Sequence, residues 1–497
     1  MEAPIQQTIP ENIPIVHAPL LKELKENEDT LPRHRRAPLA IYFIVTAFTF
    51  VLLVLTPQAG VSVPIFVLLQ GAMLWRVKPP NKSRKHLLLL IPIFLLALNP
   101  FISANTMWHG ASFIVSALLF GLMQVWAVHG LSFQNKTYGL LEKLIFATRS
   151  AFKKIPLPFT WGVHIKAESR PMVRRVIIGA LASVPVLIFL IIMLSMADPI
   201  FFRVVDDIFL NLARLISFST IWRIIFGTLA GLYMFGVVYG ITLGRYKYKA
   251  TNGIAPITGD CVILNVVLSS ALMVYTLFVA IQFRYLFASP DSLPYGLTFA
   301  NYARRGFFEL LFLTAINVGF MLVTIAITKT QKGRGAKITK ALCLYLCMVT
   351  VVLLISSFYR MWLYSSDDGL TRMRFLVFGF LIFQGVGLIF TCLYILRPRF
   401  NIVTVYALIA LCYFITLNLI PMDRLIAREQ INRYLAGERT CAAYVLSLSP
   451  DAAPEIKRLL NSPNPQTQAA ANSTLYWMGR DYAQGNLRQW NISRRRV

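Results

Sequence analysis

The chain has 497 residues, of which 56% are hydrophobic and only 14% are charged, and its formal net charge is +27. A composition this apolar excludes a protein built only of soluble domains. The basic excess lies beside long apolar runs, and no zinc-finger or RNA-binding motif accompanies it, so we expect no nucleic-acid partner. The partners that we expect are the lipid bilayer and its anionic headgroups, together with a membrane or envelope protein.

Eleven apolar runs are long enough to cross a hydrocarbon core of about 30 Å as helices. They predict an all-α fold, a polytopic transmembrane helix bundle of about 11 spans over residues 37–420, preceded by a disordered cytoplasmic tail at 1–36. The runs are approximately 37–55, 58–75, 87–104, 110–130, 176–196, 223–243, 261–283, 307–328, 338–358, 373–396 and 401–420.

Basic residues in the connecting loops alternate between the two sides. Five loops predicted inside carry 24 Lys and Arg residues, and three loops predicted outside carry nine. Because basic residues in short loops stay cytoplasmic, we predict a bacterial inner-membrane protein with its N-terminus inside and its C-terminus outside. The longest inner loop, 131–175, has apolar positions near helical spacing, which predicts an interfacial segment on the inner headgroups.

Two features of the spans predict how they pack. The sixth span contains Gly227–Gly231 and Gly236–Gly240, spacings that let helices approach closely, and we expect packing within the chain rather than dimerisation. Asn265 and Asn317 lie inside spans seven and eight, where interhelical hydrogen bonds are the expected role.

Residues 421–497 differ in composition, with eleven Lys or Arg and six Asp or Glu residues. We predict a small helical C-terminal extramembrane domain on the outer face. Ser449 and Pro450 indicate a helix start, as the cap and the first helical residue. The helical stretches are 422–435, 441–448, 451–460 and 466–482.

Charged residues near the outer membrane boundary are the candidate site. Glu309 should lie about one turn below the surface, and we expect it to pair with Arg305, four residues earlier, or with Arg284. Two interpretations stay open: ion pairs that tie helix ends together, or a vestibule in which arginines bind a polar or anionic group. The candidates are Arg284, Arg304, Arg305, Glu309, Arg360, Asp367, Asp368, Arg372 and Arg374.

Signatures of catalysis are absent from the sequence. It has no Walker A loop, no HExxH motif and no convincing dinucleotide fingerprint, so no catalytic residue, cofactor or metal is predicted. Cys343 and Cys347 share a helix face without further ligands and are expected to pack. Asp260 and Glu309 could serve a proton path, but they are predicted at opposite membrane faces. Asp367 and Asp368 precede Gly369 and are expected in a turn.

Four motifs resemble an uncharacterised bacterial membrane family. They are RRGFFELL at 304–311, RMWLY with GLTRMR at 360–374, IAREQINRYL with LSLSPD at 426–451, and WNISR at 490–494. The resemblance covers roughly residues 170–497 and is to the domain of unknown function four-one-seven-three, related to four-one-five-three. It implies a polytopic membrane protein and no established activity.

Three functions follow as hypotheses. The first is a non-enzymatic envelope transporter, channel or lipid-handling component with a charged outer vestibule. The second is a membrane-bound transferase or hydrolase acting at the outer face. The third is a signalling or scaffold subunit that binds partners through loop 131–175 and the exported tail.

Overall fold

The computed structural model describes residues 33–55, 59–76, 84–129, 218–243, 259–286, 307–328, 331, 333–438, 442–483 and 489–496, with isolated positions between 145 and 207. Every regular element in these residues is a helix, which confirms the all-α class. The predicted tail up to residue 32, most of loop 131–175 and most of the fifth span lie outside the described residues.

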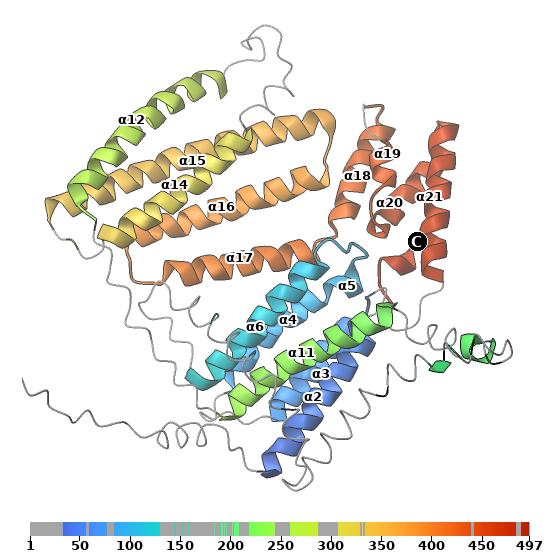
Figure 1. Cartoon of the computed structure of the whole chain (residues 1–497). Coiled ribbons are helices and arrows are strands. Elements are labelled where there is room, and N and C mark those ends of the chain that lie inside the picture. Colours follow the sequence, from blue (N-terminus) through green and yellow to red (C-terminus); the bar gives the residue numbers. More distant parts are fainter. Residues whose placement is uncertain are drawn as a thin grey trace, which may run out of the picture.

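Two groups of apolar helices and a smaller terminal group make up the described part of the chain (Figure 1). The first bundle contains α2 (Arg33–Leu53), α3 (Ser62–Arg76), η1 (Lys85–Leu89), α4 (Leu90–Ala97), α5 (Asn99–Ile102), α6 (His109–His129) and α11 (Phe218–Leu243). The second bundle contains α12 (Cys261–Leu286), α14 (Phe307–Thr328), α15 (Arg334–Asp368), α16 (Arg372–Leu396) and α17 (Ile402–Leu419).

The predicted spans correspond closely to these helices. Eight helical segments in the described residues are long and apolar enough to cross a membrane, and one of them is the run Lys85–Ile102 formed by η1, α4 and α5. The first two predicted spans correspond to α2 and α3, whose apolar parts are shorter than those eight segments. The structure therefore supports a protein with many membrane-spanning helices, as the hydropathy predicted.

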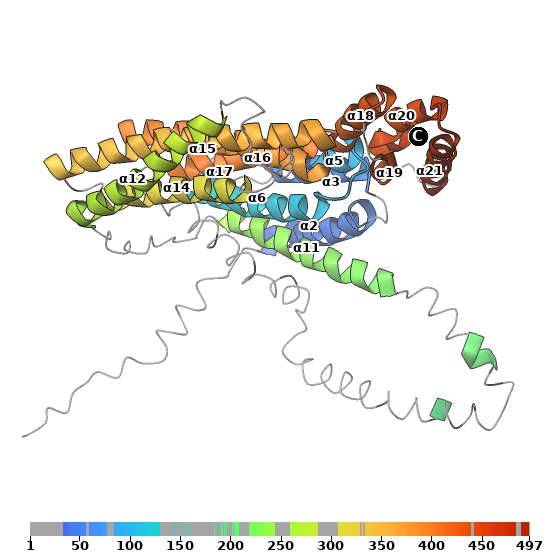
Figure 2. The same ribbon diagram turned by 90° about the horizontal axis from the view of Figure 1, so that it is seen from above.

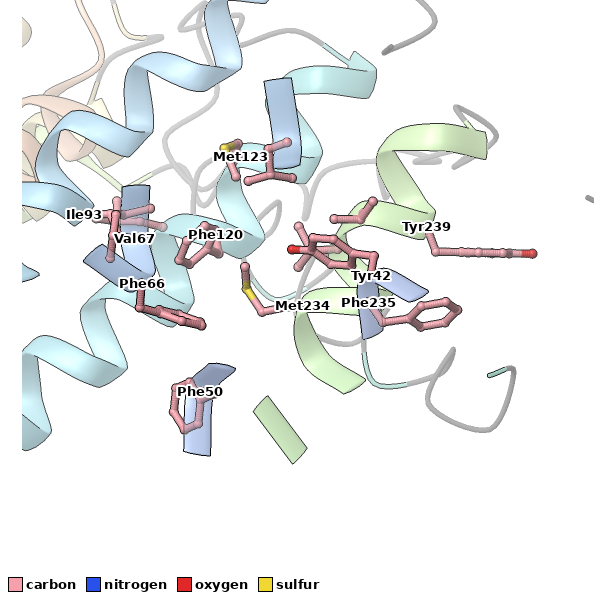
Figure 3. Close-up of a cluster of buried hydrophobic side chains, with 14 of the residues drawn as sticks. Tyr42, Phe50, Phe66, Val67, Ile93, Phe120, Met123, Met234, Phe235 and Tyr239 are labelled. Atoms are coloured by element: carbon pink, nitrogen blue, oxygen red, sulfur yellow. The ribbon is translucent and has the colours of Figure 1, made fainter. Parts of the chain in front are cut away.

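The first bundle has its own hydrophobic core. Figure 3 shows aromatic and methionine side chains of α2, α3, α6 and α11 that belong to this core, with Phe235 and Tyr239 of α11 at one side of it. Glycine permits the closest approach, because Gly231 lies where an added Cβ would stand 2.8 Å from the Cβ of Ala47, and Gly227 abuts Val51 in the same way. The predicted close packing within the chain is confirmed at Gly227–Gly231.

The second bundle has a separate core that includes interhelical hydrogen bonds. Asn317 accepts from the Tyr275 hydroxyl at 2.7 Å and donates to Thr350 at 3.2 Å. Asn265 accepts from Thr339 at 2.7 Å. Both asparagines therefore have the interhelical role that the sequence predicted, and their polar groups are satisfied within the membrane-spanning region.

The terminal group packs across the end of the second bundle. It contains α18 (Met422–Leu435), α19 (Ala442–Leu446), η4 (Pro450–Ala452), α20 (Ala453–Ile456), η5 (Lys457–Asn461) and α21 (Pro465–Ala483). Its core is small, and Leu370, Phe375 and Leu376 of the second bundle pack against it. Ser449 occupies the predicted cap position, but its side chain makes no cap hydrogen bond. The stretch predicted as one helix over 451–460 is instead three short helical segments.

We call the end of the molecule where α18 to α21 lie the junction end, and the opposite end the far end (Figures 1 and 2). Loops predicted to share a side gather at the same end. Val61 N–H donates to the Trp490 carbonyl, and Ile492 N–H donates to the Phe101 carbonyl, so the predicted outer ends of two spans meet the segment that follows the terminal group. At the far end the Gln331 amide donates to the Gly259 carbonyl, which joins two predicted inner loops.

The segment 359–371, predicted to lie mostly in an outer loop, is largely helical. Helix α15 continues to Asp368 and α16 begins at Arg372, so Arg360, Asp367 and Asp368 are helical residues and the expected turn is confined to Gly369–Thr371. At 35 residues, α15 is about 52 Å long, well beyond a hydrocarbon core of about 30 Å. The charged residues from Arg360 onward lie where α15 leaves the apolar region. The hydropathy pattern changes at that point, so it predicted the end of the helix there although α15 continues.

Candidate functional site

The α15–α16 turn meets α18 at the junction end. Gly369 has φ +78°, a conformation that favours glycine, and an added Cβ would collide with the side chain of Gln430. The Gln430 amide donates to the Leu370 carbonyl at 2.9 Å, and Glu429 accepts from Leu370 N–H at 3.0 Å. The backbone of this turn is therefore held by α18 side chains.

Asp423 is the most buried charged group of this junction. Arg372 binds it through two parallel hydrogen bonds from one edge of its guanidinium, with Nε to Oδ1 and Nη2 to Oδ2 each at 2.7 Å. Asp423 is fully buried, while 36% of the Arg372 side chain is exposed. Asn105 Nδ2 at 3.1 Å and Ser449 N–H at 3.2 Å add two further donors, one of them from the first bundle.

The electrostatics of Asp423 follow from these contacts. Burial raises the pKa of a carboxyl group, but here the hydrogen bonds and positive charge of Arg372 outweigh burial and hold the pKa of Asp423 below its ordinary value. The group is thus a carboxylate at neutral pH, and its donors are arranged around that charged form.

The other arginines of the turn act on the end of α15. Arg433 donates to the carbonyls of Ser365, Ser366 and Asp367 at 3.1, 2.8 and 3.0 Å, which are among the last carbonyls of the helix. Arg374 is buried, donates to the Gly369 carbonyl, and lies 3.8 Å from the ring centroid of Tyr364. These cations satisfy a helix C-terminus, where positive charge is stabilising.

A second group of contacts joins the terminal group to the first bundle. Asp451 accepts from the Ser103 hydroxyl and from Ala104 N–H, the latter at 2.6 Å. Asn491 donates to the carbonyls of Pro100 and Ser103 at 2.6 and 2.8 Å. The loop after α5 is therefore fixed by two side chains that lie more than 340 residues away in the sequence.

The predicted site residues separate into those that the structure brings together and those that it does not. Arg372 and Arg374 lie at the junction, and Asp367 lies beside them with its side chain exposed. Arg360 is buried within α15. Glu309 is exposed near the start of α14.

The structure describes less of most of the remaining predicted residues. Asp368 ends α15, and Arg284 lies in the last turn of α12, with the side chains of both outside the described atoms. Arg304 and Arg305 lie outside the described residues, so the pairing of Glu309 with an arginine stays a prediction.

Asp260 caps α12 at the far end, where it accepts from Val262 N–H at 2.7 Å, remote from Glu309.

Sequence reasoning missed the partners Asp423, Asp451, Arg433 and Asn491. Asp423 is the third residue after the predicted end of the last span, and an acidic residue there suggests only a helix start. Nothing local in the sequence indicates that it meets Arg372, 51 residues earlier.

The charged groups of the junction hold helix ends and the turn between α15 and α16. Each described carboxylate of the junction core accepts hydrogen bonds from protein donors. No group of three or more His, Cys, Asp or Glu side chains within the described part of the chain could hold a metal ion. The geometry therefore favours ion pairs that tie helix ends together.

The apolar helices and the polar junction define a helical integral membrane protein. The chain belongs to the family described as Domain of unknown function (DUF4153), whose sequence profile matches residues 90–459. That range includes part of the first bundle, the whole second bundle and the terminal group as far as η5. Neither the curated proteins nor the solved structures include a significant match.

Proposed function

We propose that this protein is a non-enzymatic transporter or lipid-handling component of the bacterial inner membrane, which works by movement of its two bundles about the junction end. One observation carries the proposal. The bundles have separate hydrophobic cores, and the side-chain hydrogen bonds that join the first bundle to the second bundle or to the terminal group among the described residues lie at or near the junction end.

The contact between the bundles is narrow. Helix α17 packs against α4 and α5, with Leu411, Phe414 and Ile415 lying on the first core. Near the end of α17, Asn418 accepts from the Ser112 hydroxyl at 2.7 Å, and its carbonyl accepts from Asn99 at 2.6 Å. The terminal group bridges the bundles at the same end, through Asp423 and Asp451.

A connection at one end lets the opposite ends separate. Rocking of one helix bundle against another is a common way for transporters to open a path alternately to the two sides, and packed cores move as rigid bodies. In this proposal the junction arginines and carboxylates hold the pivot. Glu309, exposed near the start of α14, is the remaining charged candidate for contact with a solute.

Orientation is part of the proposal. The basic loops favour the far end as cytoplasmic and the junction end as external. A reporter that is active only outside the cytoplasm, fused after Val497, should be active. Activity of a cytoplasmic reporter at that position would reverse the orientation.

Distance measurements between spin labels test the movement without knowledge of the solute. In a variant without native cysteines, one label pair at Leu88 and Leu396 reports on the far ends, and a control pair at Met107 and Met373 reports on the junction end. All four side chains are exposed. Electron–electron resonance in lipid nanodiscs should give a broad or two-peaked distribution for the far pair and a single narrow one for the control pair. Narrow distributions for both pairs would contradict the proposal and favour a rigid scaffold.

A scaffold is the second candidate, because α21 presents an aromatic face. Tyr476 and Trp477 are 64% and 54% exposed, and Arg480 lies 5.1 Å from the Trp477 ring centroid. Aromatic residues and arginine are enriched where proteins bind each other. A photoreactive amino acid at Tyr476 in intact cells should give one discrete protein adduct if this face binds a partner, whereas lipid adducts alone would exclude that role.

A further inference from the structure

A lateral groove opens on the first bundle between α3 and the η1–α4 run. Its volume is about 420 Å³, within the range of small-molecule sites. The groove is hollow because Gly71 and Ala72 contribute almost no side chain to its wall. Its lining residues, all apolar, are Val67, Leu68, Gly71, Ala72, Trp75, Leu87, Leu90 and Phe94.

The groove faces the bilayer rather than the protein interior. Leu68 and Trp75 are 59% and 57% exposed, although both lie on an apolar helix of the first bundle. An apolar hollow on the lipid-facing side of a bundle matches a hydrocarbon chain. The pairing of α3 with the run after it is antiparallel, so the groove runs along the helices from Val67 and Phe94 toward the far end at Trp75 and Leu87.

Basic residues stand where the groove reaches the far end. Arg76 ends α3, and Arg84 and Lys85 begin the η1 segment, all three with exposed side chains. The guanidinium carbon of Arg84 lies 4.2 Å from the ring centroid of Trp75, itself a lining residue, which holds the cation over the rim of the groove.

The described helices of the first bundle provide no carboxylate for these cations. No Asp or Glu occurs between Asp29 and Glu142, a stretch that contains α2 to α6, and α11 contains none either. The first bundle therefore presents positive charge at its far end without acidic residues of its own helices to neutralise it. This differs from the junction end, where Arg372 and Arg433 have carboxylate partners.

We propose that this groove binds an anionic phospholipid, with one acyl chain between α3 and α4 and the phosphate at Arg76, Arg84 and Lys85. Basic pockets between membrane helices bind lipid headgroups through this charge complementarity. The site does not depend on movement of the bundles.

Quenching of tryptophan fluorescence tests the site on the full-length protein. Phosphatidylglycerol with brominated acyl chains quenches a tryptophan that it touches, and a Trp75→Phe variant isolates the contribution of Trp75. Phosphatidylcholine with the same brominated chains serves as the neutral probe. We expect phosphatidylglycerol to quench Trp75 at concentrations at least tenfold lower than phosphatidylcholine does.

Two variants and a matched control decide the interpretation. Arg76→Gln with Arg84→Gln and Lys85→Gln should abolish the preference for phosphatidylglycerol, and Ala72→Phe should reduce quenching by both lipids by filling the groove. The control, Arg334→Gln with Lys337→Gln and Lys340→Gln, removes the same charge from exposed far-end positions of the second bundle and should change the preference less than twofold.

Three outcomes would overturn the proposal. They are equal quenching by the two lipids, an unchanged preference in the groove triple variant, and an equal loss in the control triple variant. The first would indicate ordinary contact with surrounding lipid, and the last would indicate general attraction to the charged surface.

Discussion

The junction end and the far end of the first bundle both concentrate arginine, yet the arginines have different surroundings. At the junction end Arg372 is bound to a fully buried carboxylate, and Arg433 caps a helix. At the far end Arg76 and Arg84 are exposed beside an apolar groove, in a stretch of sequence without acidic residues. The same residue type therefore fixes helices where a carboxylate lies beside it, and in our proposal it binds lipid at the far end, where the described helices of the first bundle contain none.

The largest expected effect is at Asp423. Replacing it with alanine leaves Arg372 and two further donors without their acceptor, a change that costs about 3 kcal/mol of stability, at the lower end for a buried pair because Arg372 is partly exposed. Thermal unfolding in detergent would measure it. Glu438→Gln is the control, since Glu438 is 53% exposed in its pair with Arg433 and should cost less than about 1 kcal/mol. Equal effects would remove the distinction between buried and exposed pairs.

The pH dependence of stability should follow the same carboxylate. The pKa of Asp423 is lower in the folded protein than its ordinary value, so the folded state binds fewer protons than the unfolded state. Its contribution is complete above the unfolded pKa of about 3.9 and is lost as the pH falls through the folded pKa. Acid unfolding of the wild type, compared with Asp423→Ala, should show a steeper loss below about pH 4 for the wild type. Parallel curves would contradict this assignment.

Asp451→Asn should have a smaller and more local effect. The amide can accept one of the two hydrogen bonds from Ser103 and Ala104, so we expect a loss of roughly 1–3 kcal/mol that loosens the terminal group from the first bundle. Limited proteolysis should cut near residues 439–441 sooner than in the wild type, while cleavage within the second bundle is unchanged. Uniformly faster cleavage would indicate global rather than local destabilisation.

The smallest effect is expected at Glu309. Its side chain is exposed, so a pair with Arg305 should couple by about 0.2–1 kcal/mol in a double-mutant cycle of Glu309→Gln and Arg305→Ala. The same cycle with Arg284→Ala identifies the partner. Zero coupling in both cycles would exclude the pairing and leave Glu309 available to a solute.

Hydropathy predicted most of the architecture, because a helix in a membrane must satisfy its backbone hydrogen bonds internally and present apolar side chains over a fixed length. It located ten of the eleven predicted spans at described helices, and the matching family is one of the two related families that the motifs resembled. It failed where α15 continues past Arg360, since a helix that leaves the apolar region changes composition without ending.

The site was less accessible to sequence reasoning. The charged residues at the ends of α15 and α16 were identified, but their partners were not, because Asp423 meets Arg372 across 51 residues and Asp451 meets Ala104 across 347. Such contacts depend on how the terminal group docks, which no local pattern specifies. The groove could not be predicted for a similar reason. Gly71 and Ala72 form its wall only because α4 packs beside α3, and no local pattern specifies that packing.

The most direct test of this division between the two ends is the change in unfolding temperature caused by phosphatidylglycerol, measured against a phosphatidylcholine background. A lipid that binds only the folded protein raises that temperature. We predict that Asp423→Ala unfolds at a lower temperature but keeps the rise, whereas Arg76→Gln with Arg84→Gln and Lys85→Gln unfolds normally in phosphatidylcholine and loses the rise. Loss of the rise in Asp423→Ala, or destabilisation of the triple variant without phosphatidylglycerol, would contradict this division.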